Sequence, residues 1–405
     1  MRIRAIREAS VPIGSAMRNA AIAFDTMTAS ALAVVTDATT DAMQDGTPLV
    51  GYAFGSIGRY AVGGILRERF IPRLLAAPPE SLLDAQGLVD PVRCQAVLMA
   101  NEKAGGHGER PGAIGLLDAA LWDLRAKQQG LPLADCIAAY YGGKALSHIA
   151  VYGSCGHYRP GESLEGLRGE VARARDAGYA LVKIKVGADA AEACARHAAA
   201  ASAMGDPGRV ALDANGSLAP DTMKAWRGAV AAQGPAWIEE PVSALDYAAL
   251  ADFTAGCAVP VATGENLFSF DDARNLLRHG GLRPKRDRVQ VDMLLAYGVP
   301  EYKRMLDGWM ADGWRASAFW PHAGHLFAAH VVAAFGLGSA EAAPDAAQPW
   351  GGFWDGSRVE AGMLSLPRHP GAGYEHKANL YSLLRPLAGS HALPSGARKP
   401  GSLAA

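Results

Sequence analysis

Cysteine is scarce in this sequence. The 405 residues include only five cysteines, and no two of them have the Cys-x-x-Cys spacing. They are Cys94, Cys136, Cys155, Cys194 and Cys257. An odd and scattered set of this kind argues against a disulfide framework. We therefore expect reduced thiols and a cytoplasmic protein.

Long apolar runs are missing too. The first residues, MRIRAIREASVPIG, lack the apolar core of about 7–15 residues that marks a secretion signal. The longest apolar stretch, about 326–340, contains His330 and is shorter than the roughly 20 residues that a membrane-spanning helix needs. These absences predict a soluble protein without a membrane partner.

Charge of one sign is not in excess. Lys and Arg together number 39 and Asp and Glu number 40, which gives a net charge of −1. This balance argues against a nucleic-acid-binding protein, which would neutralise many phosphates. A pocket can still be locally basic, so a small anionic substrate fits the composition. Hydrophobic residues make up 50% of the chain, enough for a large core.

The first 125 or so residues have the pattern of a mixed α+β region. We expect a strand within 23–40, turns within 51–64, and helices at 67–77, 90–103 and 112–130. At the other end, residues 388–405 are rich in Gly, Pro and Ser. This composition predicts a disordered tail.

From about residue 148 on, short β-like runs alternate with alanine-rich helical stretches. The runs are 148–154, 180–187, 209–216, 236–241, 259–266, 288–293 and 315–322. Such alternation predicts βαβ units and a parallel sheet.

Five of these runs carry an ionisable residue at their end, at intervals of 26 to 28 residues. The five are Lys185, Asp213, Glu239, Glu265 and Asp292, and His322 follows 30 residues later. One strand, one helix and two loops occupy about that length. The period therefore predicts a (β/α)8 barrel, whose functional site lies at the C-terminal ends of the strands.

Side chains alternate along a strand, so the barrel interior can be predicted. Lys183 and Lys185 would point to the barrel axis together, because Val182, Ile184 and Val186 are apolar and would face the helices. The same alternation turns Asp213 and Asn215 inward, and likewise Gln290 and Asp292.

Three carboxylates on successive strand ends predict a cation site. Two unit charges roughly 4 Å apart repel by about 4 kcal/mol at an effective dielectric constant of about 20, and a divalent ion removes that repulsion. Asp213, Glu239 and Glu265 offer only oxygen ligands, which favours one Mg²⁺ per subunit. Glu240 competes with Glu239, and we choose Glu239 because it shares a strand face with Trp237. The alternative is that each carboxylate merely caps the following helix.

An acid–base pair would flank this cation. A neighbouring ammonium from Lys183 and the cation would lower the pKa of Lys185 towards roughly 7–8, which suits a general base. Asp292 would fix the tautomer of His322, a candidate acid, although His322 could also be a satisfied core histidine. We leave His325 as structural. The set suits removal of a proton beside a carboxylate, followed by dehydration or racemisation; a non-catalytic binding barrel is the remote alternative.

The motifs together resemble the enolase superfamily in its mandelate racemase-like branch, over nearly the whole chain. They are KIK at 183–185, DANG at 213–216, WIEEP at 237–241, ATGEN at 262–266, QVD at 290–292 and WPHAGH at 320–325. The resemblance implies a modified (β/α)8 TIM barrel at 126–365 with an N-terminal α+β capping domain at 1–125, completed by about 366–387. It also implies a homo-oligomer.

Within that branch the chain is most similar to D(−)-tartrate dehydratases, through residues 101–110, 262–284 and 348–356. That similarity implies a small hydroxy-acid substrate, a 2-keto acid product, Lys185 as the base and His322, paired with Asp292, as the acid. Another acid sugar or diacid, or racemisation, stays open.

The same resemblance implies a set of substrate contacts. They are Lys183, Lys103, Asn215, Glu341 at the eighth strand, His157 and Gly55. Gly55 and Ile57 stand where the tartrate enzymes are expected to have amides, and His157 stands where they are expected to have an aromatic residue. A lost hydrogen bond there would cost about 1–3 kcal/mol, which weakens the case for tartrate itself.

Overall fold

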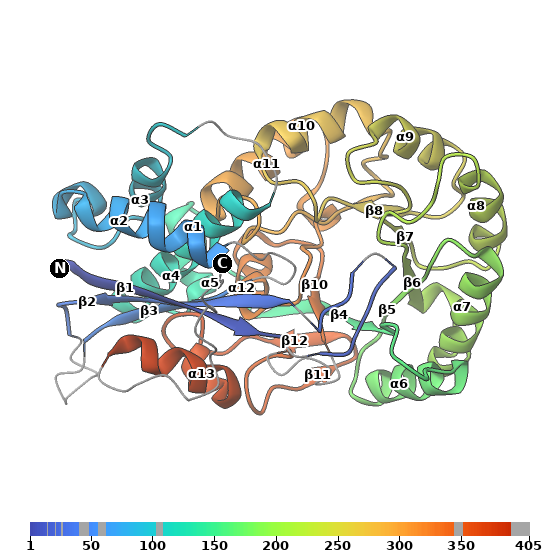
Figure 1. Cartoon of the computed structure of the whole chain (residues 1–405), viewed down its shortest axis with the longest axis horizontal. Helices are drawn as coiled ribbons and strands as arrows, with labels where there is room; N and C mark the ends of the chain where they lie inside the picture. Colours follow the sequence, from blue (N-terminus) through green and yellow to red (C-terminus); the bar gives the residue numbers. More distant parts are fainter. Residues whose placement is uncertain are drawn as a thin grey trace, which may run out of the picture.

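The computed structural model describes residues 1–13, 15–20, 22–25, 27–39, 48–55, 62–102, 108–343 and 351–389. The described chain forms a three-stranded sheet with flanking helices, joined to a barrel whose helices lie on its outer side (Figure 1). This is the predicted architecture, a barrel with an N-terminal α+β region.

The N-terminal sheet is antiparallel and has the order β1-β2-β3. Its strands are β1 (Ile3–Pro12), β2 (Thr28–Thr36) and β3 (Val50–Phe54). The helical segments that follow are α1 (Val62–Ile65), η1 (Leu66–Phe70), α2 (Ile71–Ala76), η2 (Pro79–Leu82), α3 (Pro91–Leu98), α4 (Glu109–Gln128) and α5 (Leu133–Tyr140). The helix predicted at 112–130 is therefore present as α4, and Gly130 beyond its end has a positive φ of 65°.

Strand β3 corrects one expectation, because residues 51–64 were predicted to be turns. A Cβ at Gly51 would collide with the carbonyl oxygen of Ala120 in α4. Glycine at this position thus lets α4 pack directly on the strand, although its local preference is for turns.

The barrel strands are parallel and follow the chain in the order β4-β5-β6-β7-β8-β9, and β10 pairs with β4 to close the ring. The strands are β4 (His148–Cys155), β5 (Val182–Lys185), β6 (Val210–Asp213), β7 (Ile238–Glu239), β8 (Val261–Thr263), β9 (Arg288–Val289) and β10 (Ala340–Ala342). The connecting helices are α6 (Leu164–Asp176), α7 (Ala190–Met204), α8 (Met223–Ala231), α9 (Tyr247–Ala255), α10 (Phe270–His279), α11 (Val299–Ala311) and α12 (Leu326–Phe335), with the short η3 (Pro207–Arg209) before β6.

One predicted strand is wrong in part. Within 315–322, residues Ala316–Ala318 form a single 3-10 turn, η4, instead of a strand. Phe319 still makes a parallel bridge to Val289, and the amide of Gly338 donates to the carbonyl of Phe319 over 2.9 Å. The seventh position of the barrel is therefore held by a few backbone hydrogen bonds, without a regular strand.

Strand alternation divides the apolar residues of the barrel into two sets. Val182 and Ile184 are fully buried in the main core, on the side of the helices. A separate cluster of Tyr152, Ala211, Trp237 and Ala262 fills the barrel interior, with Trp320 packed against it. Tyr152 and Trp237 meet edge to face at 5.3 Å. This aromatic layer lies inside the barrel, below the polar residues at the C-terminal ends of the strands.

The C-terminal segment returns to the N-terminal sheet. After β11 (Val359–Glu360) and β12 (Met363–Ser365) come η5 (Tyr374–His376), α13 (Ala378–Leu384) and η6 (Arg385–Ala388). Segments α13 and η6 pack on β2, and Arg7 Nη1 donates to the carbonyl of Leu387 over 2.8 Å. In Figure 1, α13 (red) lies beside β1–β3.

The expected division of the chain at 125/126 falls inside α4 (Glu109–Gln128). Of the expected tail at 388–405, Ala388 ends η6 and the residues from 390 on lie outside the described residues.

Candidate active site

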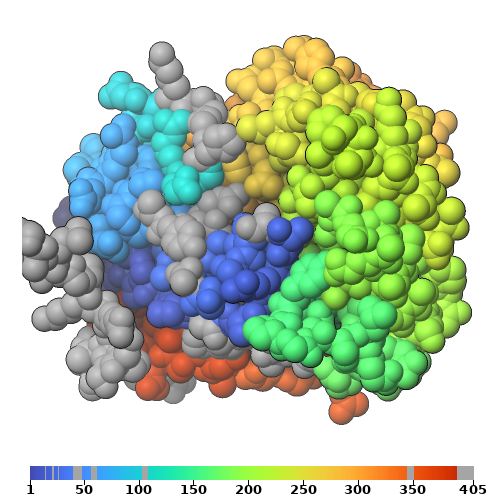
Figure 2. All heavy atoms as spheres, turned by 45° about the vertical axis from the view of Figure 1, so that its right-hand side comes forward, coloured from blue at the N-terminus to red at the C-terminus, as the bar shows by residue number. Residues whose placement is uncertain are grey.

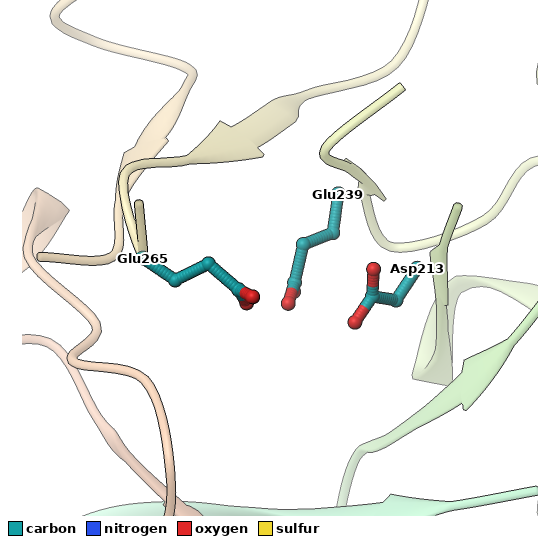
Figure 3. A group of neighbouring side chains, drawn as sticks. All are labelled: Asp213, Glu239 and Glu265. Carbon is teal, nitrogen blue, oxygen red and sulfur yellow. The ribbon is translucent and has the colours of Figure 1, made fainter. Parts of the chain in front are cut away.

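Three carboxylates converge at the C-terminal ends of neighbouring strands (Figure 3). Asp213 ends β6 and Glu239 ends β7, and the two residues are register partners in the parallel sheet. Glu265 follows β8 by two residues. One oxygen of each carboxylate lies within 4.8 Å of the others, so the three can share one cation. Asp213 and Glu239 are fully buried, and Glu265 is partly exposed.

The surroundings fit a hard cation. Oε2 of Glu265 and Oδ1 of Asn215 are buried, and neither has a hydrogen-bond partner among the described residues. Buried oxygen atoms without a donor are costly unless something else satisfies them. Oxygen ligands are what Mg²⁺ prefers.

Three neighbouring side chains hold the carboxylate of Glu239. It accepts hydrogen bonds from Lys183, from Gln290 Nε2 over 2.7 Å and from Trp237 Nε1 over 3.1 Å. Burial raises its pKa to about 8 despite the attraction of Lys183, and Asp213 adds to the rise. The alternative ligand Glu240 accepts a 2.9 Å hydrogen bond from Asn266 instead, and it is not part of the triad.

Two buried lysines lie on the Asp213 side of the triad. Lys185 Nζ is 2.5 Å from Asp213 Oδ2, and Lys183 Nζ is 3.3 Å from the same oxygen and 3.1 Å from Glu341 Oε1. Burial disfavours the charged form of Lys185, but Asp213 reverses this effect and raises the pKa above its ordinary value. The protein groups alone therefore do not lower the pKa of Lys185, and the low pKa expected for it depends on the bound cation. The same lysines hold the pKa of Asp213 well below its usual range.

His322 lies on the opposite flank of the triad. Its Nε2 is 3.5 Å from Glu265 Oε2 and its Nδ1 is 3.4 Å from Asp292 Oδ2. Burial would lower the pKa of His322, but Glu265, the hydrogen bond with Asp292 and Glu341 together raise it to about 9. These acidic neighbours favour the protonated ring, which is the form that can donate a proton.

His325 belongs to the same group, although the sequence reasoning left it as structural. Its Nε2 is 3.1 Å from Asp292 Oδ1, while its Nδ1 accepts the amide hydrogen of Ala328 at the start of α12. Its position directly before the apolar run 326–335 is a helix-start signal that could have pointed to the capping contact. Nothing local pointed to the contact with Asp292.

The expected substrate contacts are spread more widely. Glu341 lies in β10 and accepts a 3.0 Å hydrogen bond from the amide of Ala323. Burial first, and Lys185 second, lower the pKa of His157 to about 3. Gly55 lies just beyond β3, where its amide donates to Ser30. Lys103 and Ile57 lie outside the described residues.

The N-terminal segment reaches the rim of the barrel beside the site. Arg18 and Tyr158 exchange two backbone hydrogen bonds of 2.8 Å, and the rings of Phe24 and His157 meet edge to face at 6.1 Å. In Figure 2 the dark blue N-terminal surface borders the green surface of the barrel. This contact ties the loop after β4 to a segment outside the barrel.

Two negative findings concern the rest of the molecule. None of the five cysteines, all of which lie in the described ranges, forms a disulfide, and four of them are buried. Across the described ranges, no helix has both the length and the apolar character needed to cross a membrane.

Comparison with known families adds to this geometry. Residues 166–380 match the family model described as "Enolase C-terminal domain-like". The chain is 31% identical over 212 residues to L-talarate/galactarate dehydratase from Salmonella typhimurium LT2, covering 52% of this chain and 51% of the relative. It is 28% identical over 222 residues to D-galactonate dehydratase from Ralstonia pickettii, covering 52% and 56%. The chain thus spans about half the length of these curated relatives.

Solved structures match over more of the chain. A racemase from Streptomyces coelicolor A3(2) with bound magnesium superposes with a TM-score of 0.73 at 22% identity, covering 93% of this chain and 99% of the other. L-talarate/galactarate dehydratase from Salmonella typhimurium LT2 gives a TM-score of 0.69 at 22% identity, with coverages of 91% and 87%. At these identities the likeness establishes the fold.

Proposed function

Because the chain belongs to the family of enolase C-terminal domain-like proteins, we propose that it is a Mg²⁺-dependent dehydratase of a 2,3-dihydroxy acid. One observation carries the proposal: Lys185 and His322 stand on opposite flanks of the three carboxylates, 2.5 Å from Asp213 and 3.5 Å from Glu265. A substrate lying along the carboxylates would have a proton acceptor at one end and a proton donor at the other.

The proposed residues have distinct roles. Asp213, Glu239 and Glu265 would hold Mg²⁺, which when bound supplies electrostatic stabilisation of the negative charge that develops on the substrate carboxylate. Lys185, as the neutral amine, takes the proton from the α-carbon. His322 gives its proton to the β-hydroxyl, and the carbon–oxygen bond breaks with release of water. The resulting enol tautomerises to a 2-keto acid.

The substrate class is an acid sugar or a related diacid. Two relatives named as dehydratases of talarate, galactarate and galactonate support this class. We propose D(−)-tartrate, which would give oxaloacetate, as the first acid to test, because of the motif resemblance described above. Lys183, which lies between Glu239 and Glu341, would contact an anionic oxygen of the substrate.

Epimerisation is the second candidate. If His322 returned a proton to the opposite face of the same carbon, the product would be the other stereoisomer and no water would leave. The two flanking groups support this chemistry equally well, and a structural neighbour is described as a racemase.

The product distinguishes these functions. The purified protein with Mg²⁺ is incubated with D(−)-tartrate, galactarate and D-galactonate in deuterated water. Release of a 2-keto acid supports the dehydratase, and α-proton exchange without keto acid supports the epimerase. If none of a broad panel of hydroxy acids shows keto acid or exchange, the chain is a non-catalytic barrel and the proposal is wrong.

A further inference from the structure

We propose that His325 is a positioning residue for the acid of this site: it holds Asp292, and through Asp292 it orients His322 towards the leaving hydroxyl. The inference rests on the proposed function, in which His322 supplies the proton for the loss of water. It assigns to His325 a task beyond capping helix α12.

The helix cap fixes where the proton of His325 lies. Nδ1 accepts the amide hydrogen of Ala328 over 3.0 Å, so this nitrogen carries no proton of its own. In the neutral ring the proton therefore sits on Nε2, the nitrogen 3.1 Å from Asp292 Oδ1. His325 is thus a hydrogen-bond donor to Asp292, and helix α12 dictates this tautomer.

Asp292 is held from two sides as a result. Its Oδ1 accepts from His325 and from the amide of Leu294 over 2.8 Å, which leaves Oδ2 turned to His322 Nδ1 at 3.4 Å. The carboxylate is fully buried. A fixed carboxylate plane fixes the direction from which His322 is bound, and so the direction in which its Nε2 points.

The other helices of the barrel make the choice of histidine informative. An N-cap needs only an acceptor, and Ser and Asp are among the usual residues there. In this chain such residues cap α6, α7, α9 and α10: Ser163, Asp189, Asp246 and Ser269. Among the described helices, α12 is the one whose cap is a histidine side chain. The second ring nitrogen, which capping does not need, is the atom that meets Asp292.

The test separates capping from positioning. His325→Asn keeps a side-chain acceptor for the amide of Ala328 but has no donor that reaches Asp292. We expect keto acid formation to fall by about 10–100-fold, part of the effect of a general acid, while Lys185-dependent exchange of the α-proton into solvent changes less than about threefold. Both rates are measured on the acid that the wild type dehydrates fastest among D(−)-tartrate, galactarate and D-galactonate.

A matched control removes a cap elsewhere. Asp246→Ala deletes the side-chain cap of α9, which accepts the amide hydrogen of Ala249 over 3.0 Å. It should lower the melting temperature without changing the ratio of exchange to dehydration. His325→Gln, which keeps an amide donor at longer reach, should retain more dehydration than His325→Asn and serves if the asparagine variant does not fold.

The outcomes are distinct. Equal losses of exchange and dehydration in His325→Asn, or no loss of either, overturn the positioning role. Absence of both activities in the wild type contradicts the proposed function instead. A readout independent of turnover is the nitrogen-15 spectrum of labelled histidines: the signal that disappears in His325→Asn should be that of a neutral ring protonated on Nε2, and any other tautomer refutes the inference.

Discussion

His330 should make this fold sensitive to acid. The side chain is fully buried in α12. Its Nδ1 accepts the amide hydrogen of Ala134, near the start of α5, over 3.2 Å, and its Nε2 faces the carbonyl of Ala372 at 3.2 Å. The N-cap residue before helix α5 is Pro132, which offers no side-chain cap, so the imidazole of His330 takes that role. A proton on Nδ1 would point at an N–H group and at the positive end of the helix.

The size of this loss of stability follows from the pKa of His330. Burial lowers the pKa of His330 from 6.5 to about 4 in the folded state. As the pH falls below 6.5 the unfolded chain binds this proton first, so the folded state loses stability. The contribution is fully present above pH 6.5 and is lost on the way down to pH 4. A difference of roughly 2.5 pKa units corresponds to about 3 kcal/mol of unfolding free energy.

Urea unfolding of the wild type and of His330→Leu at a series of pH values measures the contribution of His330 to the free energy of unfolding. Other buried groups titrate in both proteins, so the difference between the two isolates His330. At pH 7.5 the variant should be less stable, because Ala134 loses its acceptor, at a cost of about 1–3 kcal/mol. By pH 4 that deficit should shrink by about 3 kcal/mol. A deficit that stays constant from pH 7.5 to pH 4 would show that His330 keeps an ordinary pKa, and the reasoning would fail.

Three further predictions concern the site. Lys185→Ala should reduce both α-proton exchange and keto acid formation by at least about 10²–10⁴-fold with an unchanged circular dichroism spectrum; full activity would remove its role as base. His322→Asn should abolish dehydration but keep exchange, measured by proton NMR in deuterated water, and normal dehydration would contradict its role as acid. Mg²⁺ at about 100 times its dissociation constant should stabilise the fold by about 2.7 kcal/mol. Glu265→Gln should weaken this stabilisation, and an equal rise in melting temperature in both proteins would place the ion elsewhere.

The carboxylate triad could be predicted because two simple regularities act together. One β/α unit takes about 26 to 28 residues here, and side chains alternate along a strand. A polar residue at the end of each strand therefore lies at the same rim and faces the axis, as Asp213 and Glu239 do. Neither step needs knowledge of distant contacts.

The wrong secondary-structure predictions concern segments whose observed conformation local sequence does not show. Gly51 belongs to a strand because α4 packs against it, and the sequence around residue 51 does not predict this contact. A tertiary contact overrides local propensity there. Residues Ala316–Ala318 make a 3-10 turn, and the backbone hydrogen bond that joins this barrel position to β9 comes later in the chain, from the amide of Trp320 to Val289 over 2.8 Å.

The pKa of Lys185 shows why charges must be counted in three dimensions. Along the sequence its evident neighbour is Lys183, which by itself would lower the pKa. Around the two ammonium groups the fold gathers four carboxylates: Asp213, Glu239, Glu265 and Glu341. With all six groups ionised the charge is −2, and His322 with Asp292 adds nothing to this sum. A divalent cation bound to the triad would cancel that charge. The bound cation would also weaken the attraction between the carboxylates and the proton of Lys185, which would let this side chain act as a base. The proposed base therefore needs the same ion that the surplus of negative charge around it favours.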